Sequence, residues 1–124
     1  MTKKRPKYLN LAEIRLPLAG FVSILHRVSG AGLVLMLPLL IYLLQLSLGT
    51  PQDAATLAMV LDNPLLKLVL LGLLWAFLHH FCMGIRIVLL DLHIGVDLPA
   101  ARASALLVQV VSLLATVILG VKLW

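Results

Sequence analysis

Residues 68–85 read LVLLGLLWAFLHHFCMGI and contain no Asp, Glu, Lys or Arg over 18 positions. A helix needs about 20 apolar residues to cross the hydrocarbon layer of a bilayer, so this stretch is long enough to span it. Two further stretches share this property, 25 residues at 28–52 and 19 residues at 103–121. Lipid offers no partner for unpaired backbone groups, and three strands cannot close a barrel. The sequence therefore predicts an all-α membrane protein with three transmembrane helices, at about 21–48, 64–91 and 102–123.

The composition excludes an ordinary soluble domain. Hydrophobic residues make up 62% of the 124 residues and charged residues 12%, whereas soluble domains average about 45–50% and about 25%. Three spans leave no room for a soluble catalytic domain, so we expect one transmembrane domain over 1–124 without catalytic residues of its own. The single cysteine, Cys82, has no partner for a disulfide or a metal site and is interpreted as a small core residue.

The basic residues indicate how the chain is oriented. The formal net charge is +5, but half of the positive side chains lie in the N-terminal tail, ahead of the first apolar stretch, which favours a topology signal over a nucleic-acid partner. Eight of them fall on the side of the N-terminus: Lys3, Lys4, Arg5, Lys7, Arg15, Arg27, Arg86 and Arg102. Only Lys67 and Lys122 fall on the other side. Because cytoplasmic loops are enriched in Lys and Arg, we expect the N-terminal segment 1–20 in the cytoplasm and the C-terminus in the periplasm.

Prolines and a capping pattern predict irregularities before and within the first span. Asn10, followed three residues later by Glu13, resembles a capping box, so we expect a short helix along the cytoplasmic surface that ends near Pro17. Pro38 should bend the first span. Between the first and second spans, residues 54–61 are expected to form a short helical turn, because Gly-Thr-Pro and Asn-Pro breakers flank them.

Two adjacent histidines stand near the middle of the second span, where a polar ring is costly and indicates a function. Steps of four residues through His80 meet only small residues: Gly72, Ala76 and Gly84. Such a bare face suits the ligand of a flat macrocycle such as haem, and it equally suits close helix packing with His80 as an interhelical hydrogen-bond donor. The face through His79 carries Trp75 and Met83 instead. We therefore expect His79 to pack or to support a neighbouring group.

A haem bound by imidazole on both faces needs a second histidine at equal depth. The candidate within this chain is His26, at the cytoplasmic start of the first span. His80 lies about ten residues inside its own span, so the two depths should differ by roughly 12 Å at 1.5 Å per residue. This mismatch predicts that the second ligand comes from another chain.

Ser23, His26 and Arg27 follow i, i+3, i+4 spacing and so share one helix face at the membrane boundary. A hydroxyl can donate to a carbonyl oxygen, and a guanidinium can bind a carboxylate or an oxyanion. This face therefore suits a ligand with a polar head and an apolar tail. In the alternative, the Arg27 side chain merely reaches the interface and Ser23 caps the helix start. Spacing alone leaves both interpretations open.

Two motifs resemble those of the cytochrome b556 membrane-anchor subunits of succinate dehydrogenase. The first is Arg5-Pro6 followed by SILHRVSG at 23–30, and the second is HFCMGIR at 80–86 followed by Asp91. With the three spans and the basic N-terminal tail, the resemblance covers nearly the whole chain. Many members carry His or Phe directly after the arginine, where this chain has Ile87. A haem contact at that position is therefore not implied.

The resemblance implies roles for individual residues. His80 would be the axial ligand of the haem iron. Ser23 and Arg27 would line a quinone site, and His26 and Arg27 would lie near the haem propionates. Asp91 would belong either to a proton path or to a subunit interface. Arg86 would share one of these two roles or would anchor the helix at the membrane interface.

The resemblance also implies a larger complex. One haem b would be shared with a second membrane-anchor subunit that supplies the other histidine. Two helices of each anchor would form a four-helix bundle, with the third helices outside. The chain would dock an iron–sulfur subunit, which receives electrons from a flavoprotein subunit that oxidises succinate. Its own part would be limited to electron transfer and to binding ubiquinone or menaquinone.

Three other interpretations compete with this one. The chain could be a haem-free membrane tether, or the anchor of a fumarate reductase that runs in the opposite direction. A small efflux protein would ordinarily need an acidic group inside a span, and none of the three uncharged stretches contains one.

The first apolar stretch is too long for a cleavable signal, and the N-terminus lacks an Arg- and Ser-rich amphipathic presequence, so we expect a bacterial inner membrane. The sequence assigns no role to His93.

Overall fold

The computed structural model describes residues 16–124, and this part of the chain contains helices joined by short turns and no strand. The helices are α1 (Leu18–Leu35), α2 (Leu37–Ser47), α3 (Pro51–Asp62), α4 (Pro64–Asp91) and α5 (Leu98–Leu123). The basic tail with its Arg5-Pro6 motif and the surface helix expected from Asn10 lie outside the described residues.

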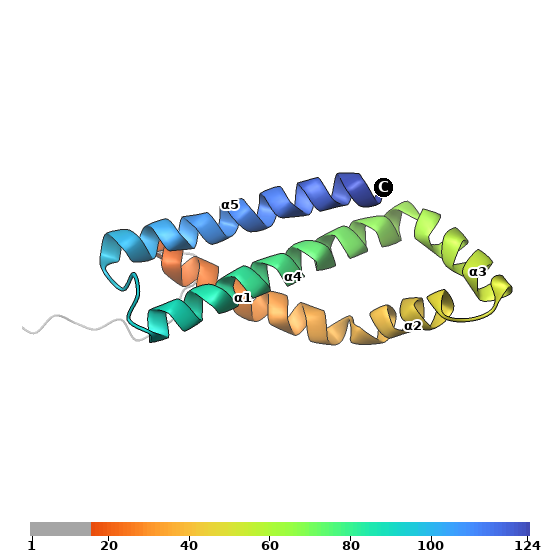
Figure 1. The fold of residues 1–124 in the computed structure, drawn as a ribbon, viewed down its shortest axis with the longest axis horizontal. Coiled ribbons are helices and arrows are strands. Elements are labelled where there is room, and N and C mark those ends of the chain that lie inside the picture. The colour runs from red at the N-terminus through yellow and green to blue at the C-terminus, as the bar shows by residue number, and fades with distance from the viewer. Residues whose placement is uncertain (1–15) are drawn as a thin grey trace, which may run out of the picture.

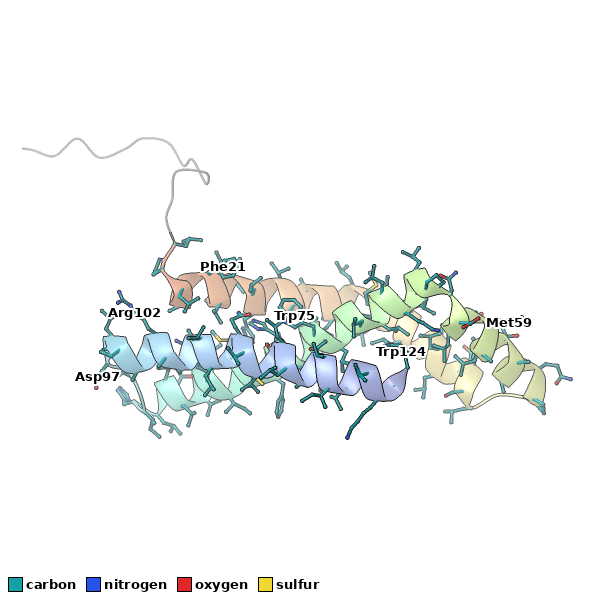
Figure 2. All side chains as sticks on the ribbon, turned by 90° about the horizontal axis from the view of Figure 1, so that it is seen from above. Phe21, Met59, Trp75, Asp97, Arg102 and Trp124 are labelled. Carbon is teal, nitrogen blue, oxygen red and sulfur yellow. The ribbon has the colours of Figure 1, made fainter. Side chains whose placement is uncertain are left out.

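The helices α1, α4 and α5 lie side by side along the long axis of the molecule (Figure 1). These three helices are long and apolar enough to cross a membrane. Their mutual core is small, formed by Val22, Met83, Ala105 and Val108. Most of the remaining large hydrophobic side chains project outward (Figure 2). A surface of this kind is stable only in lipid or against other subunits, so the prediction of an all-α membrane protein with three spans is confirmed.

The first predicted span is divided at Met36. Its backbone there has φ −92° and ψ 0°, which ends α1 and begins α2. Pro38 follows within the first turn of α2, where its missing N–H leaves no hydrogen bond unmade. Figure 1 shows the chain changing direction at this point. The bend expected at Pro38 is therefore confirmed, and α1 and α2 together cover the range predicted for one helix.

The connection between α2 and α4 is a helix rather than a short turn. Thr50 and Asp53 form a capping box at the start of α3, with the Thr50 N–H donating to Asp53 Oδ2 at 2.8 Å and the Asp53 N–H donating to Thr50 Oγ1 at 3.3 Å. The Thr50 hydroxyl also donates to Asp53 Oδ2, at 2.8 Å. The bonds from the Thr50 amide and then from this hydroxyl hold the pKa of Asp53 below its usual value. Asn63 then ends α3 and caps α4 by accepting from the Leu65 N–H at 2.9 Å.

The turn after α4 is closed by a histidine in the left-handed region. His93 has φ 60°, and its N–H donates to the Leu90 carbonyl at 2.9 Å. The next N–H, of Ile94, donates to the Leu89 carbonyl at 2.9 Å. This is the hydrogen-bond pattern of a Schellman motif, whose left-handed position usually holds glycine. Gly95, with φ 72°, completes the reversal toward α5.

We predict opposite effects of glycine changes at these two left-handed positions. His93→Gly should raise the free energy of unfolding by about 1 kcal/mol, because it relieves the Cβ clash of the left-handed backbone. Gly95→Ala should lower it by a similar amount, since it introduces that clash. Thermal unfolding of the detergent-solubilised protein measures both. A loss of stability in His93→Gly would show that the imidazole makes a contact that outweighs the strain.

Candidate functional site

His80 is held at the interface between α4 and α1 by its Nδ1 atom. Nδ1 lies 3.1 Å from the backbone carbonyl oxygen of His26 and 3.3 Å from Oγ of Ser29. The Ser29 hydroxyl itself donates to the same His26 carbonyl at 2.9 Å. A carbonyl oxygen can only accept, so in the neutral imidazole Nδ1 carries the proton and donates it to His26. The lone pair then lies on Nε2, which makes no hydrogen bond within residues 16–124.

The His26 ring stacks on the His80 ring. The ring centroids are 4.1 Å apart and the ring planes are inclined by 20°. The expected depth difference of roughly 12 Å between the two histidines is therefore wrong. That estimate placed the membrane boundary at Arg27, the first charged residue before the span. The helix in fact begins at Leu18, so His26 lies about 12 Å along α1 and His80 about 17 Å from the end of α4.

Gly30 makes room for this arrangement. A Cβ atom at position 30 would lie 2.7 Å from Cε1 and 3.2 Å from Nδ1 of His80. The ring could not yield without losing its bond to the His26 carbonyl. No role is predicted for Ser29 or Gly30 from the sequence, although both belong to the SILHRVSG motif. The spacing of Ser29, three residues after His26, does allow its hydroxyl to donate to the His26 carbonyl within one helix.

A hollow of about 410 Å³ lies beside His80 on the outer surface of α4. It is lined by His80, Phe81, Gly84, Ile85, Val88 and Leu89. A Cβ added at Gly84 or Gly72 would meet nothing within 4 Å, while Ala76 is buried. Two of the three small residues in the predicted bare stripe therefore face open space and do not serve close packing within the chain.

His79 has different surroundings from His80. Its side chain is fully buried and stacks on the Trp75 indole with ring centroids 5.2 Å apart. Neither ring nitrogen has a hydrogen-bond partner among the described residues. Met83, one turn further along α4, is also buried. The structure thus places His79 in the interior, in agreement with the packing role expected for it.

Ser23, His26 and Arg27 lie on one face of α1. Ser23 and His26 are half-buried, and Arg27 is exposed. The helix begins at Leu18 and is preceded by Pro17 as its N-cap residue. Ser23 lies more than one turn inside α1, so the interpretation of Ser23 as a cap of the helix start is wrong.

The residues after His80 separate into buried and exposed positions. Arg86 is 8% exposed and reaches α5, with Nε donating to Ser104 Oγ at 3.0 Å. Ile87 packs against the core, which accounts for an aliphatic residue there. Asp91 is the last residue of α4 and is exposed. Its carboxylate is therefore accessible to solvent at the end of α4.

These features define a class of protein, an integral membrane protein whose α1–α4 interface presents an oriented imidazole, with a hydroxyl and a guanidinium on the same helix α1. The model of the family described as "Succinate dehydrogenase/Fumarate reductase transmembrane subunit" matches residues 1–119. The chain therefore belongs to this family, and its resemblance to the cytochrome b556 membrane anchors of succinate dehydrogenase is confirmed.

Three curated relatives are similar to this chain over most of its length. The chain is 38% identical to the succinate dehydrogenase cytochrome b556 subunit of Coxiella burnetii, over 100% of both chains. It is 31% identical to the subunit of the same name from Paracoccus denitrificans, over 82% of this chain and 78% of the relative. For the corresponding subunit of Rickettsia felis the identity is 30%, over 95% and 92%.

We predict that Gly30 and Gly32 respond oppositely to alanine. Gly30→Ala should lower the free energy of unfolding, because overpacking against the His80 ring costs about 1–3 kcal/mol. Gly32→Ala is the matched control on the same helix, since its Cβ would meet nothing within 4 Å; it should gain up to about 1 kcal/mol of helix propensity. Thermal unfolding in detergent compares them. Equal stabilisation by both changes would show that the ring of His80 is not held in place.

Proposed function

We propose that this chain is the haem b-binding membrane-anchor subunit of a succinate dehydrogenase complex and contributes to its quinone site. The bond from His80 Nδ1 to the His26 carbonyl fits both a haem ligand and a plain interhelical donor; the observation that favours the ligand is the open apolar hollow beside the ring, which close helix packing would have filled. Histidines that bind metals usually donate the other ring N–H to a carbonyl or carboxylate, which fixes the tautomer and raises ligand basicity. His80 has this arrangement on a membrane-spanning helix.

The surroundings of His80 fit a haem. The apolar hollow beside it and the open surface at Gly84 leave space for a flat ring system. The family relatives carry the name cytochrome b556, which supports a b-type haem. The haem would supply a one-electron redox centre, and this chain would hold it through Nε2 of His80. Arg27 and His26 would offer positive charge and hydrogen bonds to its propionates.

The opposite axial ligand would come from a second membrane-anchor subunit. The rings of His26 and His80 lie face to face, whereas two axial imidazoles must point their nitrogen atoms at one iron from opposite sides. His26 therefore does not suit the role of second haem ligand, because of the orientation of its ring and not because of its depth in the membrane. We propose that α1 and α4 form a four-helix bundle with two helices of that subunit, with α5 on the outside.

Quinone would bind near Ser23 and Arg27 on α1. Ser23 is half-buried and Arg27 is exposed on the same face of α1, which suits contact with a polar head group at the membrane boundary. The hydroxyl would donate to a quinone carbonyl oxygen, and the guanidinium would stabilise the negative charge that develops as the ring is reduced. The apolar tail of ubiquinone or menaquinone would lie along the exposed apolar surface of α1.

Two further subunits would complete the proposed complex. A flavoprotein subunit would oxidise succinate, and an iron–sulfur subunit would pass electrons to the membrane. Asp91 would meet the iron–sulfur subunit through an ion pair or serve a proton path.

In Figure 2, Phe21, Asp97 and Arg102 lie at one end of the molecule and Met59 at the other. We assign the first end to the cytoplasm of a bacterial inner membrane and the C-terminus to the periplasm.

An anchor of a fumarate reductase is the second candidate, because the family description includes that enzyme. The two differ in the direction of electron flow and use the same kind of anchor. Quinone reduction with succinate and quinol oxidation with fumarate, measured on the purified complex, distinguish them. A faster succinate-to-quinone reaction supports succinate dehydrogenase.

We predict that His80→Leu abolishes or alters the haem spectrum of the purified complex. His79→Leu is the matched control, since the neighbouring ring is buried and stacks on Trp75; it should leave the haem bands in place. Reduced-minus-oxidised spectra and a pyridine haemochrome assay measure both variants. Unchanged bis-imidazole bands in His80→Leu would overturn the ligand assignment, and absence of haem from the assembled wild-type complex would leave only a tether.

We predict that Ser23→Ala and Arg27→Leu slow quinone reduction, by about tenfold or more if each removes one hydrogen bond made in the transition state. Succinate oxidation by an artificial water-soluble acceptor should persist, because it does not use the membrane site. Ser47→Ala, which alters an exposed serine of α2, is the control. Equal loss of both activities would point to failed assembly instead of a quinone site.

A further inference from the structure

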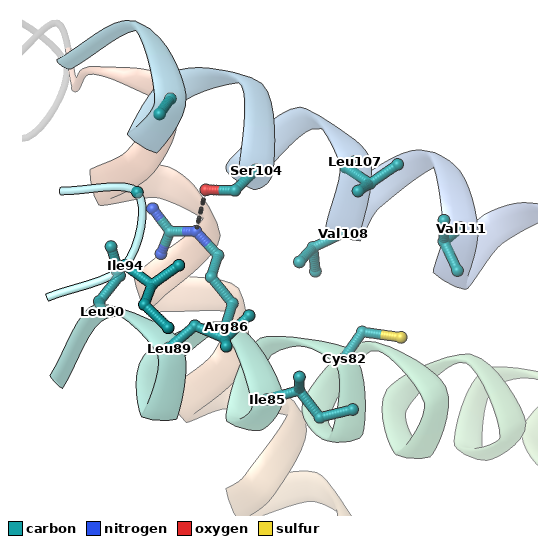
Figure 3. Close-up of a pocket in the computed structure, with 12 residues that line it drawn as sticks. Cys82, Ile85, Arg86, Leu89, Leu90, Ile94, Ser104, Leu107, Val108 and Val111 are labelled. Carbon is teal, nitrogen blue, oxygen red and sulfur yellow. Dashed lines mark hydrogen bonds between the residues drawn. The ribbon is translucent and has the colours of Figure 1, made fainter. Parts of the chain in front are cut away.

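A cavity between α4 and α5 ends on a buried arginine. Its volume is about 380 Å³, and it is bounded by α4, by the turn after α4 and by α5 (Figure 3). Arg86 lies at the end nearest the turn, where Gly95 and Ala100 also line the wall. This cavity is separate from the hollow that His80 lines, although Ile85 and Leu89 border both.

Among residues 16–124, no carboxylate forms an ion pair with Arg86. Nε donates to Ser104 Oγ at 3.0 Å, one terminal nitrogen donates to the Ala101 carbonyl at 3.1 Å, and the other lies 3.8 Å from the sulfur of Met83. The side-chain ion pair found within residues 16–124 is Lys67–Asp62, so no carboxylate there neutralises the guanidinium. A buried cation without an anion is unfavourable, and Arg86 is only 8% exposed.

The rest of the cavity is apolar and runs along the helices. Between Ala100 and Val111 on α5 it extends about 16 Å at 1.5 Å per residue. Its outer rim consists of side chains that are 41–61% exposed on the outside of the helices: Ile85, Leu89, Leu107 and Val111. An elongated apolar groove parallel to a membrane-spanning helix matches an acyl chain, and Arg86 lies about five residues before the end of α4, near head-group depth.

We propose that this cavity binds one phospholipid, with the phosphate on Arg86 and one acyl chain in the groove between α4 and α5. A phosphodiester supplies the negative charge that the guanidinium lacks, and arginine binds phosphate through charge-assisted hydrogen bonds. A neutral quinone would leave the charge of Arg86 uncompensated. The bound lipid fixes α5 against α4 at the cytoplasmic end. This proposal does not depend on the haem or quinone assignments.

Native mass spectrometry tests it on the full chain, purified from membranes with its accompanying subunits and washed extensively in detergent. Wild type should retain one phospholipid and rebind added phosphatidylglycerol. Arg86→Gln should weaken rebinding by about tenfold, which is the loss of one charge-assisted contact. Arg102→Gln is the control, because it removes an exposed arginine from the same end of α5 and should rebind as wild type does.

A second variant separates the groove from the charge. Val111→Phe fills the apolar end of the cavity and keeps Arg86, so it should also weaken rebinding, and it carries the test if Arg86→Gln fails to assemble. Equal rebinding by wild type, Arg86→Gln and Val111→Phe would overturn the proposal. Retention of inorganic phosphate without lipid, or displacement of the lipid by a subunit's carboxylate on Arg86, would overturn it as well.

Discussion

The bond from His80 Nδ1 to the backbone carbonyl of His26 is the interaction on which the site depends. It joins α4 to α1 in a region where lipid gives helices no hydrophobic reason to associate, and interhelical hydrogen bonds therefore matter. It also selects the tautomer that leaves the Nε2 lone pair free. Ser29 reinforces it, and Gly30 permits it by omitting the side chain that would occupy the same space. One short segment of α1 thus orients the candidate ligand of α4.

Lipid tolerates few polar groups, and the spanning helices accommodate those they carry in different ways. Ser112 and Thr116 on α5 satisfy their hydroxyls on their own helix, through the carbonyls of Gln109 and Ser112. Among residues 16–124, His79 is buried against Trp75 and finds no hydrogen-bond partner, and Arg86 is buried and pairs with no carboxylate. A small core and a large exposed apolar surface leave much of the stability to lipid and to neighbouring subunits.

The fold could be predicted from the sequence because the number and position of membrane-spanning helices depend mainly on the length of uncharged stretches along the chain. Uncharged stretches locate the spans, and Pro38 locates the bend. The depth of His26 was predicted wrongly because the first charged residue, Arg27, was used as the membrane boundary, although α1 continues to Leu18 beyond it. The roles of Ser29 and Gly30 are tertiary, since they depend on which face of α1 meets α4. The motif that contains them suggested membership of a family, but not which of its residues position the imidazole.

A density map of the assembled complex, at a resolution that shows side chains, is the most direct test of His80 as the haem ligand. We expect iron bound at Nε2 of His80, with Nδ1 still within hydrogen-bonding distance of the His26 carbonyl and a tetrapyrrole over the surface at Gly84. A map in which the ring of His80 contacts only protein, or in which His79 binds the iron instead, would contradict it.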